Sequence, residues 1–134
     1  MEYLSAVDHA LRAMSTADDP GTSAQLALRL AMAAWERCQP TGRAAADWAL
    51  FGTGVMAVSE LLDPTPAAVA ISLDEPRLAD SEQIRTRTAE LATVAAQVLR
   101  SASQRPTTAV QRRWDYESAA TELDRAARYL VRHP

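Results

Sequence analysis

The sequence predicts an all-α protein, an antiparallel bundle of four to five helices with one crossover connection. Three observations lead to this prediction. Alanine, the best helix former and a poor strand residue, supplies 28 of the 134 residues. Residues that favour strands are scarce, because the chain has only two isoleucines and one phenylalanine. Bulky apolar side chains recur every three or four positions in five segments, which is the spacing of one face of a helix.

The first two helices are expected at about residues 2–14 and 22–38. In the first, the apolar residues form one stripe at 3-4-3 spacing: Leu4, Val7, Leu11 and Met14. A turn at residues 18–21 separates it from the second helix, which Thr22 and Gln25 would open as a capping box.

The third helix, at about residues 43–62, is apolar on two sides, and this pattern predicts the central helix of the bundle. Gly52 and Gly54 lie in its middle, where each costs about 1 kcal/mol relative to alanine. We expect close approach of a neighbouring helix to compensate for this cost. A local kink beside a pocket is the alternative.

Residues 63–80 form the crossover connection, in which Thr65 and Pro66 could start a short helix. The fourth helix is expected from Asp80, as N-cap, to about residue 102. The fifth is expected from Thr107 or Thr108 to about residue 131. Each has one inward stripe: Ile84, Thr88, Leu91, Ala95, Val98 and Leu99 in the fourth, and Tyr116, Ala119, Leu123, Ala127 and Leu130 in the fifth.

Length and composition indicate one domain over residues 1–134, since a second core would leave both too small. All 14 basic residues are arginine, which a GC-rich genome explains. The net charge of −3 gives no reason to expect nucleic acid or an anionic membrane as a partner. The charge is uneven, however: residues 1–99 hold 7 Arg and 13 acids, and residues 100–134 hold 7 Arg and 4 acids.

The sequence lacks the residue patterns of the common cofactor-binding and metal-binding sites, so we expect no cofactor and no metal. The glycine-rich loops that hold phosphate are missing, and so is the Glu-x-x-His pattern of di-iron bundles. Cys38 is the only cysteine, and His9 and His133 stand near opposite ends of the chain, so neither a disulfide nor a zinc site is expected. We expect Cys38 to be a buried or unreactive thiol.

We also expect a cytoplasmic protein that does not enter a membrane. The first residues carry acids at Glu2 and Asp8 and have no basic region, so they do not read as a signal peptide. The longest apolar run, from Trp48 to Ser59, is too short to span a bilayer.

Two carboxylates interrupt the third helix. If Asp47 or Glu60 faced the core, desolvation would raise its pKa and make it a candidate acid or base. The favoured interpretation places both in solvent, with Asp47 paired with Arg43 across one turn.

Arg128 and His133 form an Arg-x4-His spacing that resembles the Arg-x4–6-His element of HEPN-type helical RNases. The resemblance implies an RNA-acting protein in which these two residues belong to the site. It covers six residues, and Tyr129 stands where the family usually has a polar residue.

The fifth helix carries the candidate interface, which comprises Val110, Trp114, Arg125, Arg128 and Arg132. At 100° per residue, Val110 and Trp114 project nearly opposite the inward stripe, on the side of the arginines. An exposed tryptophan beside arginines is typical of a binding hot spot, for a second copy, an acidic partner or stacked bases. Alternatively, Trp114 packs under the 63–80 connection.

The leading hypothesis is therefore a small helical interaction or regulatory protein that acts by protein–protein contact, as a homo-oligomer or with another protein. The alternative is a cofactor-independent enzyme or apolar-ligand-binding bundle whose pocket is lined by Trp35, Trp48 and Phe51. A weaker alternative is an RNA-acting protein that uses the arginine-rich fifth helix.

Overall fold

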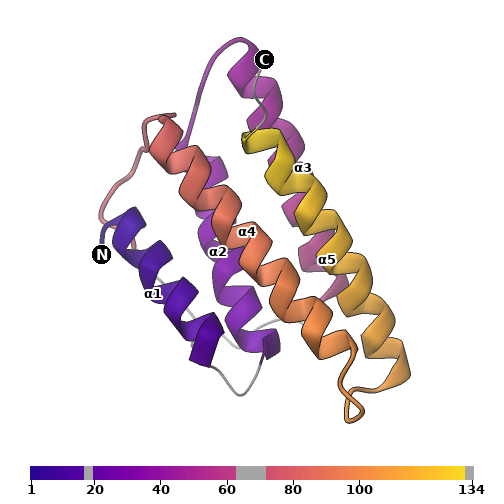
Figure 1. The fold of residues 1–134 in the computed structure, drawn as a ribbon. Coiled ribbons are helices and arrows are strands. Elements are labelled where there is room, and N and C mark those ends of the chain that lie inside the picture. Colours follow the sequence, from indigo (N-terminus) through magenta and orange to yellow (C-terminus); the bar gives the residue numbers. More distant parts are fainter. Residues whose placement is uncertain (17–19, 63–71, 132–134) are drawn as a thin grey trace.

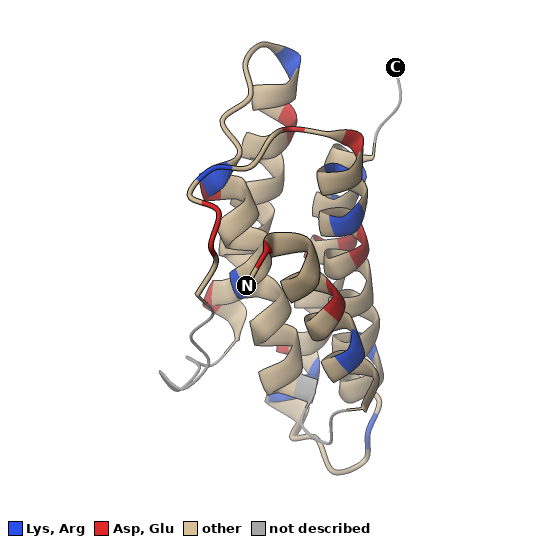
Figure 2. Cartoon of the chain, turned by 90° about the vertical axis from the view of Figure 1, so that its left-hand side faces the viewer, with Lys and Arg blue, Asp and Glu red and all other residues tan. Residues whose placement is uncertain are grey.

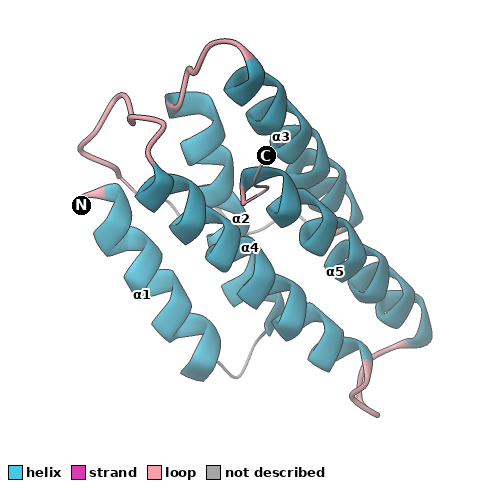
Figure 3. Cartoon of the chain, turned by 45° about the horizontal axis from the view of Figure 1, so that its top comes forward, coloured by secondary structure: helices cyan, strands magenta, loops and turns pink. Residues whose placement is uncertain are grey.

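The computed structural model describes residues 1–16, 20–62 and 72–131, and all regular structure in these ranges is helical (Figures 1 and 3). The helices are α1 (Tyr3–Thr16), α2 (Pro20–Arg37), α3 (Arg43–Leu61), α4 (Glu82–Ser103) and α5 (Val110–Leu130). The predicted all-α class is thus confirmed for the described residues. None of these helices is long and apolar enough to cross a membrane.

Three of the predicted helix starts are wrong. Helix α2 begins at Pro20, whose fixed φ suits the first turn of a helix, so Thr22 and Gln25 lie inside it and do not cap it. The N-cap of α4 is Ser81, whose Oγ accepts the Ile84 N–H at 3.1 Å.

Helix α5 begins at Val110, later than either candidate threonine. Thr108 does not open this helix, because its hydroxyl donates to the Ala102 carbonyl at 2.8 Å and so belongs to the end of α4.

The helices pack in two layers, with α1, α4 and α5 in front of α2 and α3 in the view of Figure 1. Helix α2 packs against α1, α3 and α4, and α4 packs against α1, α2 and α5. The prediction that the third helix is central is wrong, since α3 packs only against α2 and α5 within the described chain. One of its two apolar sides, which carries Leu50, Ala57 and Leu61, stays partly exposed, since Leu50 is 46% exposed and the other two are only partly buried.

The inward stripes predicted for the fourth and fifth helices are confirmed, because nearly all of their residues are buried. The exceptions are Val98 and Tyr116, which are partly buried and pack against the core. A buried hydroxyl pair joins α1 to α4, where Tyr3 Oη lies 2.7 Å from Thr88 Oγ1. Burial raises the pKa of Tyr3, although the hydrogen bond to Thr88 opposes this rise.

Close approach explains both glycines of α3, as predicted. A Cβ on Gly52 would lie 2.7 Å from Trp35 Nε1 and nearer still to two carbons of the same ring on α2. A Cβ on Gly54 would lie 2.9 Å from the Cβ of Ala126 on α5. Neither distance leaves room for a side chain, so the missing Cβ atoms let α3 pack closely against both neighbours.

The part of the α3–α4 connection that the structure describes, residues 72–81, contacts the C-terminal end of α2. Leu78 forms a single parallel bridge with Cys38, in which the Leu78 N–H donates to the Arg37 carbonyl at 3.1 Å. The Arg37 Nε–H in turn donates to the Glu75 carbonyl at 2.9 Å. The short helix expected from Thr65 and Pro66 lies outside the described residues.

The finer arrangement stays a prediction. The crossover runs through residues 63–71, which lie outside the described residues, so the antiparallel bundle with one crossover is not tested. The assignment of residues 1–134 to one domain likewise stays a prediction.

Candidate functional site

The outer face of α5 exposes two large apolar side chains. Val110 is 68% exposed and Trp114 is 69% exposed. Their outward direction, predicted from the helical projection, is confirmed, and the described part of the connection between α3 and α4, residues 72–81, does not bury Trp114. The Trp114 indole therefore leaves a large apolar surface in contact with water.

Large exposed hydrophobic side chains gather on one part of the described chain. Apart from Met1, all of them belong to α3 and α5 or directly follow α5: Leu50, Met56, Val110, Trp114 and Val131. Helices α1, α2 and α4 add none to this set. Among the described residues, helices α3 and α5 therefore carry most of the large apolar side chains that remain exposed to water.

Six of the exposed positions of α5 form a straight stripe at spacings of three or four residues, which we call the α5 stripe: Val110, Trp114, Glu117, Thr121, Arg125 and Arg128. Arg132 continues this spacing but lies outside the described residues. The stripe is apolar at its start, acidic at Glu117 and basic at its end. Within the same helix, Arg125 pairs with Glu122 at 3.1 Å.

An open groove of about 520 Å³ runs beside the start of the α5 stripe. Its lining comes from the end of α3 and from the first and middle turns of α5: Leu61, Trp114, Glu117, Ser118, Thr121 and Glu122. Two glutamates border it, so the groove combines an apolar wall with negative charge. Sequence analysis missed this groove, because Leu61 and Trp114 are 53 positions apart and only the packing of α3 on α5 brings them together.

The predicted pocket aromatics lie together but contribute to the core. Trp48 and Phe51 are 1% and 0% exposed, and their rings meet edge to face with centroids 5.7 Å apart. Trp35 is partly buried against Gly52. The groove beside α5 is lined by other residues, and a ligand pocket at these three aromatics stays a prediction.

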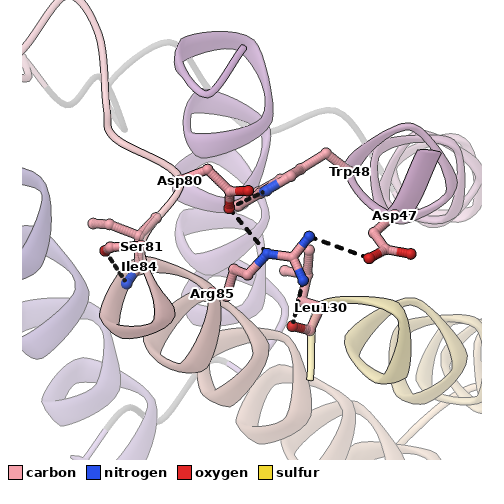
Figure 4. A network of polar contacts seen from close by, with 7 residues as sticks. All are labelled: Asp47, Trp48, Asp80, Ser81, Ile84, Arg85 and Leu130. Atoms are coloured by element: carbon pink, nitrogen blue, oxygen red, sulfur yellow. Dashed lines mark hydrogen bonds and ion pairs between the residues drawn. The ribbon is translucent and has the colours of Figure 1, made fainter. Parts of the chain in front are cut away.

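A polar network joins α3, α4, α5 and the segment before α4 (Figure 4). Arg85 lies at its centre, with Nε 2.9 Å from Asp80 Oδ1, Nη2 3.2 Å from Asp47 Oδ2 and Nη1 3.2 Å from the Leu130 carbonyl oxygen. The indole Nε1 of Trp48 donates to Asp80 Oδ1 at 2.8 Å. Asp80 thus binds a core tryptophan and an arginine, and this explains why it does not cap α4.

The favoured interpretation of Asp47 is wrong. The Asp47 side chain is only 15% exposed, and its described partner is Arg85 on α4 rather than Arg43 one turn away. Glu60 is exposed, as expected. Because Asp47 is held by a guanidinium, the network is suited to joining helices rather than to moving a proton.

The network also acts on the nearby thiol. Cys38 is buried, as predicted, and burial raises its pKa to about 11. The negative charge of Asp80 adds to this rise, and the positive charge of Arg85 opposes it. Burial alone would lower the pKa of Arg85, but its hydrogen bonds and its attraction to Asp80 and Asp47 outweigh burial and raise it.

Charge of both signs is spread over the helices and connections in the view of Figure 2. Across the described ranges, no three His, Cys, Asp or Glu side chains lie close enough together to hold a metal ion. Of the Arg-x4-His pair, Arg128 is exposed on α5, and His133 lies outside the described residues. Comparison with protein-family models, curated proteins and solved structures found no match for this chain.

Proposed function

We propose that this chain is a small interaction protein that acts by protein–protein contact, and that the α5 stripe with the adjoining groove is its contact surface. The observation that carries the proposal is the 69% exposure of Trp114 on the outer face of α5, the face that also carries Arg125 and Arg128 about three and four turns further along the helix. Tryptophan and arginine are the residues most enriched at the centres of interfaces, because they lose a large hydrated surface on binding.

The surroundings of Trp114 support the same surface. Leu61 and Trp114 give the groove an apolar wall, and Glu117 and Glu122 provide charge at its border. An apolar centre with a charged rim is the usual anatomy of a protein interface. The partner is either a second copy of this chain or another protein, and the proposal also includes a cytoplasmic location, with the antiparallel bundle serving as a rigid support for α5.

Photo-crosslinking in the cells that make the protein tests this proposal. A photoreactive amino acid is placed at Ser118, which is exposed, lines the groove and leaves Trp114 intact. The matched control carries the same amino acid at Gln97, an exposed position on α4. We expect protein adducts from position 118 and few from position 97.

Adding Trp114→Ala to the Ser118 probe should reduce these adducts, since truncating a central tryptophan typically weakens an interface about 30-fold or more. Equal adducts from both positions, or adducts that do not respond to Trp114→Ala, would contradict the proposal. Mass spectrometry of the adducts then separates a second copy of this chain from a different protein.

A further inference from the structure

We infer that the α5 stripe binds the α5 stripe of a second copy, antiparallel and about a twofold axis that passes beside Thr121. This inference rests on the proposed function and goes further, because it names the partner and the register. It follows from the order of the exposed residues along α5, which is complementary to itself when one copy of the helix is reversed.

The positions of the stripe are symmetric about Thr121. Four residues before and after it stand Glu117 and Arg125, and seven residues before and after it stand Trp114 and Arg128. In an antiparallel pair of helices with a twofold axis at Thr121, each of these positions faces its counterpart on the second copy. All five residues are exposed, so the pairing requires no rearrangement of the core.

The facing residues are chemically complementary. Glu117 of one copy faces Arg125 of the other, which places opposite charges together twice because the interface is isologous. Trp114 faces Arg128 of the second copy, which suits a guanidinium stacked on an indole. Two α5 helices in parallel, with the same residues side by side, would instead place Glu117 beside Glu117 and Arg125 beside Arg125.

Pairing also replaces a weak internal contact with a better one. Arg125 is now paired with Glu122 three residues earlier on an exposed helix surface, with 58% of its side chain accessible. Exposed ion pairs of this kind contribute little, so giving up this pair to reach Glu117 of a second copy has little cost. The indole of Trp114, now 69% exposed, would lose water on one side.

The size of the stripe indicates a reversible dimer. Standard interfaces use about 20–30 residues a side, and the stripe and groove together provide nine described residues, less than half of that. We therefore expect a dissociation constant on the order of micromolar or weaker, with dimers visible at concentrations on the order of 100 µM.

Sedimentation equilibrium of the purified chain and of charge-reversed variants tests the register. Glu117→Arg makes both facing pairs Arg–Arg, and Arg125→Glu makes both pairs Glu–Glu. Each variant alone should dimerise about tenfold or more weakly than the wild type. An equimolar mixture of the two should dimerise at least as well as the wild type, because every facing pair is then of opposite charge.

Glu36→Arg, an exposed charge reversal on α2, which does not pack against α5 within the described chain, should leave dimerisation unchanged. Circular dichroism checks that each variant keeps the helical fold. A chain that stays monomeric at concentrations on the order of 500 µM, or single variants that are not rescued by mixing, would overturn the inference. Adducts from Ser118 to a different protein would at the same time keep the proposed function, so the two failures are distinguishable.

Discussion

Replacing Gly52 by alanine should destabilise the fold, although alanine is the better helix former. On propensity alone the substitution would stabilise α3 by about 1 kcal/mol. The new Cβ would lie 2.7 Å from Trp35 Nε1 and closer to two ring carbons, so the indole must move. Because Trp35 packs against the core, it cannot swing away freely, and overpacking of this kind costs about 1–3 kcal/mol. Because all three ring atoms would lie far inside van der Waals contact, the cost is at the upper end of this range and the net loss is about 1–2 kcal/mol.

Urea unfolding followed by circular dichroism measures this loss. Thr53→Ala is the matched control, because Thr53 is exposed on the same turn of α3 and its hydroxyl only bonds the Ala49 carbonyl at 2.9 Å. There we expect stabilisation by a few tenths of a kcal/mol, since alanine is the better helix former.

A double-mutant cycle with Trp35→Ala isolates the clash. If the indole causes the loss, Gly52→Ala should destabilise the Trp35→Ala protein by at least about 1 kcal/mol less than the wild type. Strict additivity, or a Gly52→Ala protein as stable as the wild type, would refute the close-packing explanation.

Three further predictions concern buried polar groups, each measured by chemical unfolding. Arg85→Met should cost about 2–4 kcal/mol, since it leaves two mostly buried carboxylates without their cation, and adding Asp47→Asn should recover part of this loss. Tyr3→Phe should cost about 1–3 kcal/mol because the buried Thr88 hydroxyl loses its partner, and a loss near zero would show that this hydroxyl finds another. Alkaline pH should destabilise the wild type more than Cys38→Ala. Folding raises the thiol pKa from 9.0 to about 11, so the unfolded chain loses its proton first; stability present below pH 9.0 is lost as the pH rises to about 11, by up to about 3 kcal/mol. Equal slopes for both proteins in this range would contradict the assignment.

The sequence predicts best what depends on helical geometry alone. The inward stripes follow from a period of 3.6 residues, and so does the outward direction of Trp114 once α5 is known to be helical. The two glycines of α3 also follow, since a glycine in mid-helix is costly without a close neighbour. That Trp114 points outward, as predicted, does not test whether Trp114 contacts another protein.

Partners that are distant in the sequence could not be predicted. Asp80 and Ser81 are both good N-caps, and the sequence does not indicate that Trp48 and Arg85 bind Asp80 and leave the cap to Ser81. Asp47 has Arg43 one turn away, yet it binds Arg85, which is 38 positions along the chain. Local spacing describes only neighbours on one helix, and these contacts depend on how the helices pack.

The prediction that α3 is the central helix of the bundle is wrong, and the exposed apolar residues on α3 and α5 bear on the proposed function. Helix α3 has apolar residues on two sides. It packs against α2 and α5, but these two helices leave Leu50 and Met56 exposed. Helix α1 covers α2 and α4 on one side of the molecule, whereas no described helix covers the outer face of α5 (Figure 1). Val110 and Trp114 lie on this uncovered face, where a contact would remove their apolar surface from water. A second copy that places its own α5 on this face would act as the absent helix, and the self-association that we propose would then complete the packing of the fold.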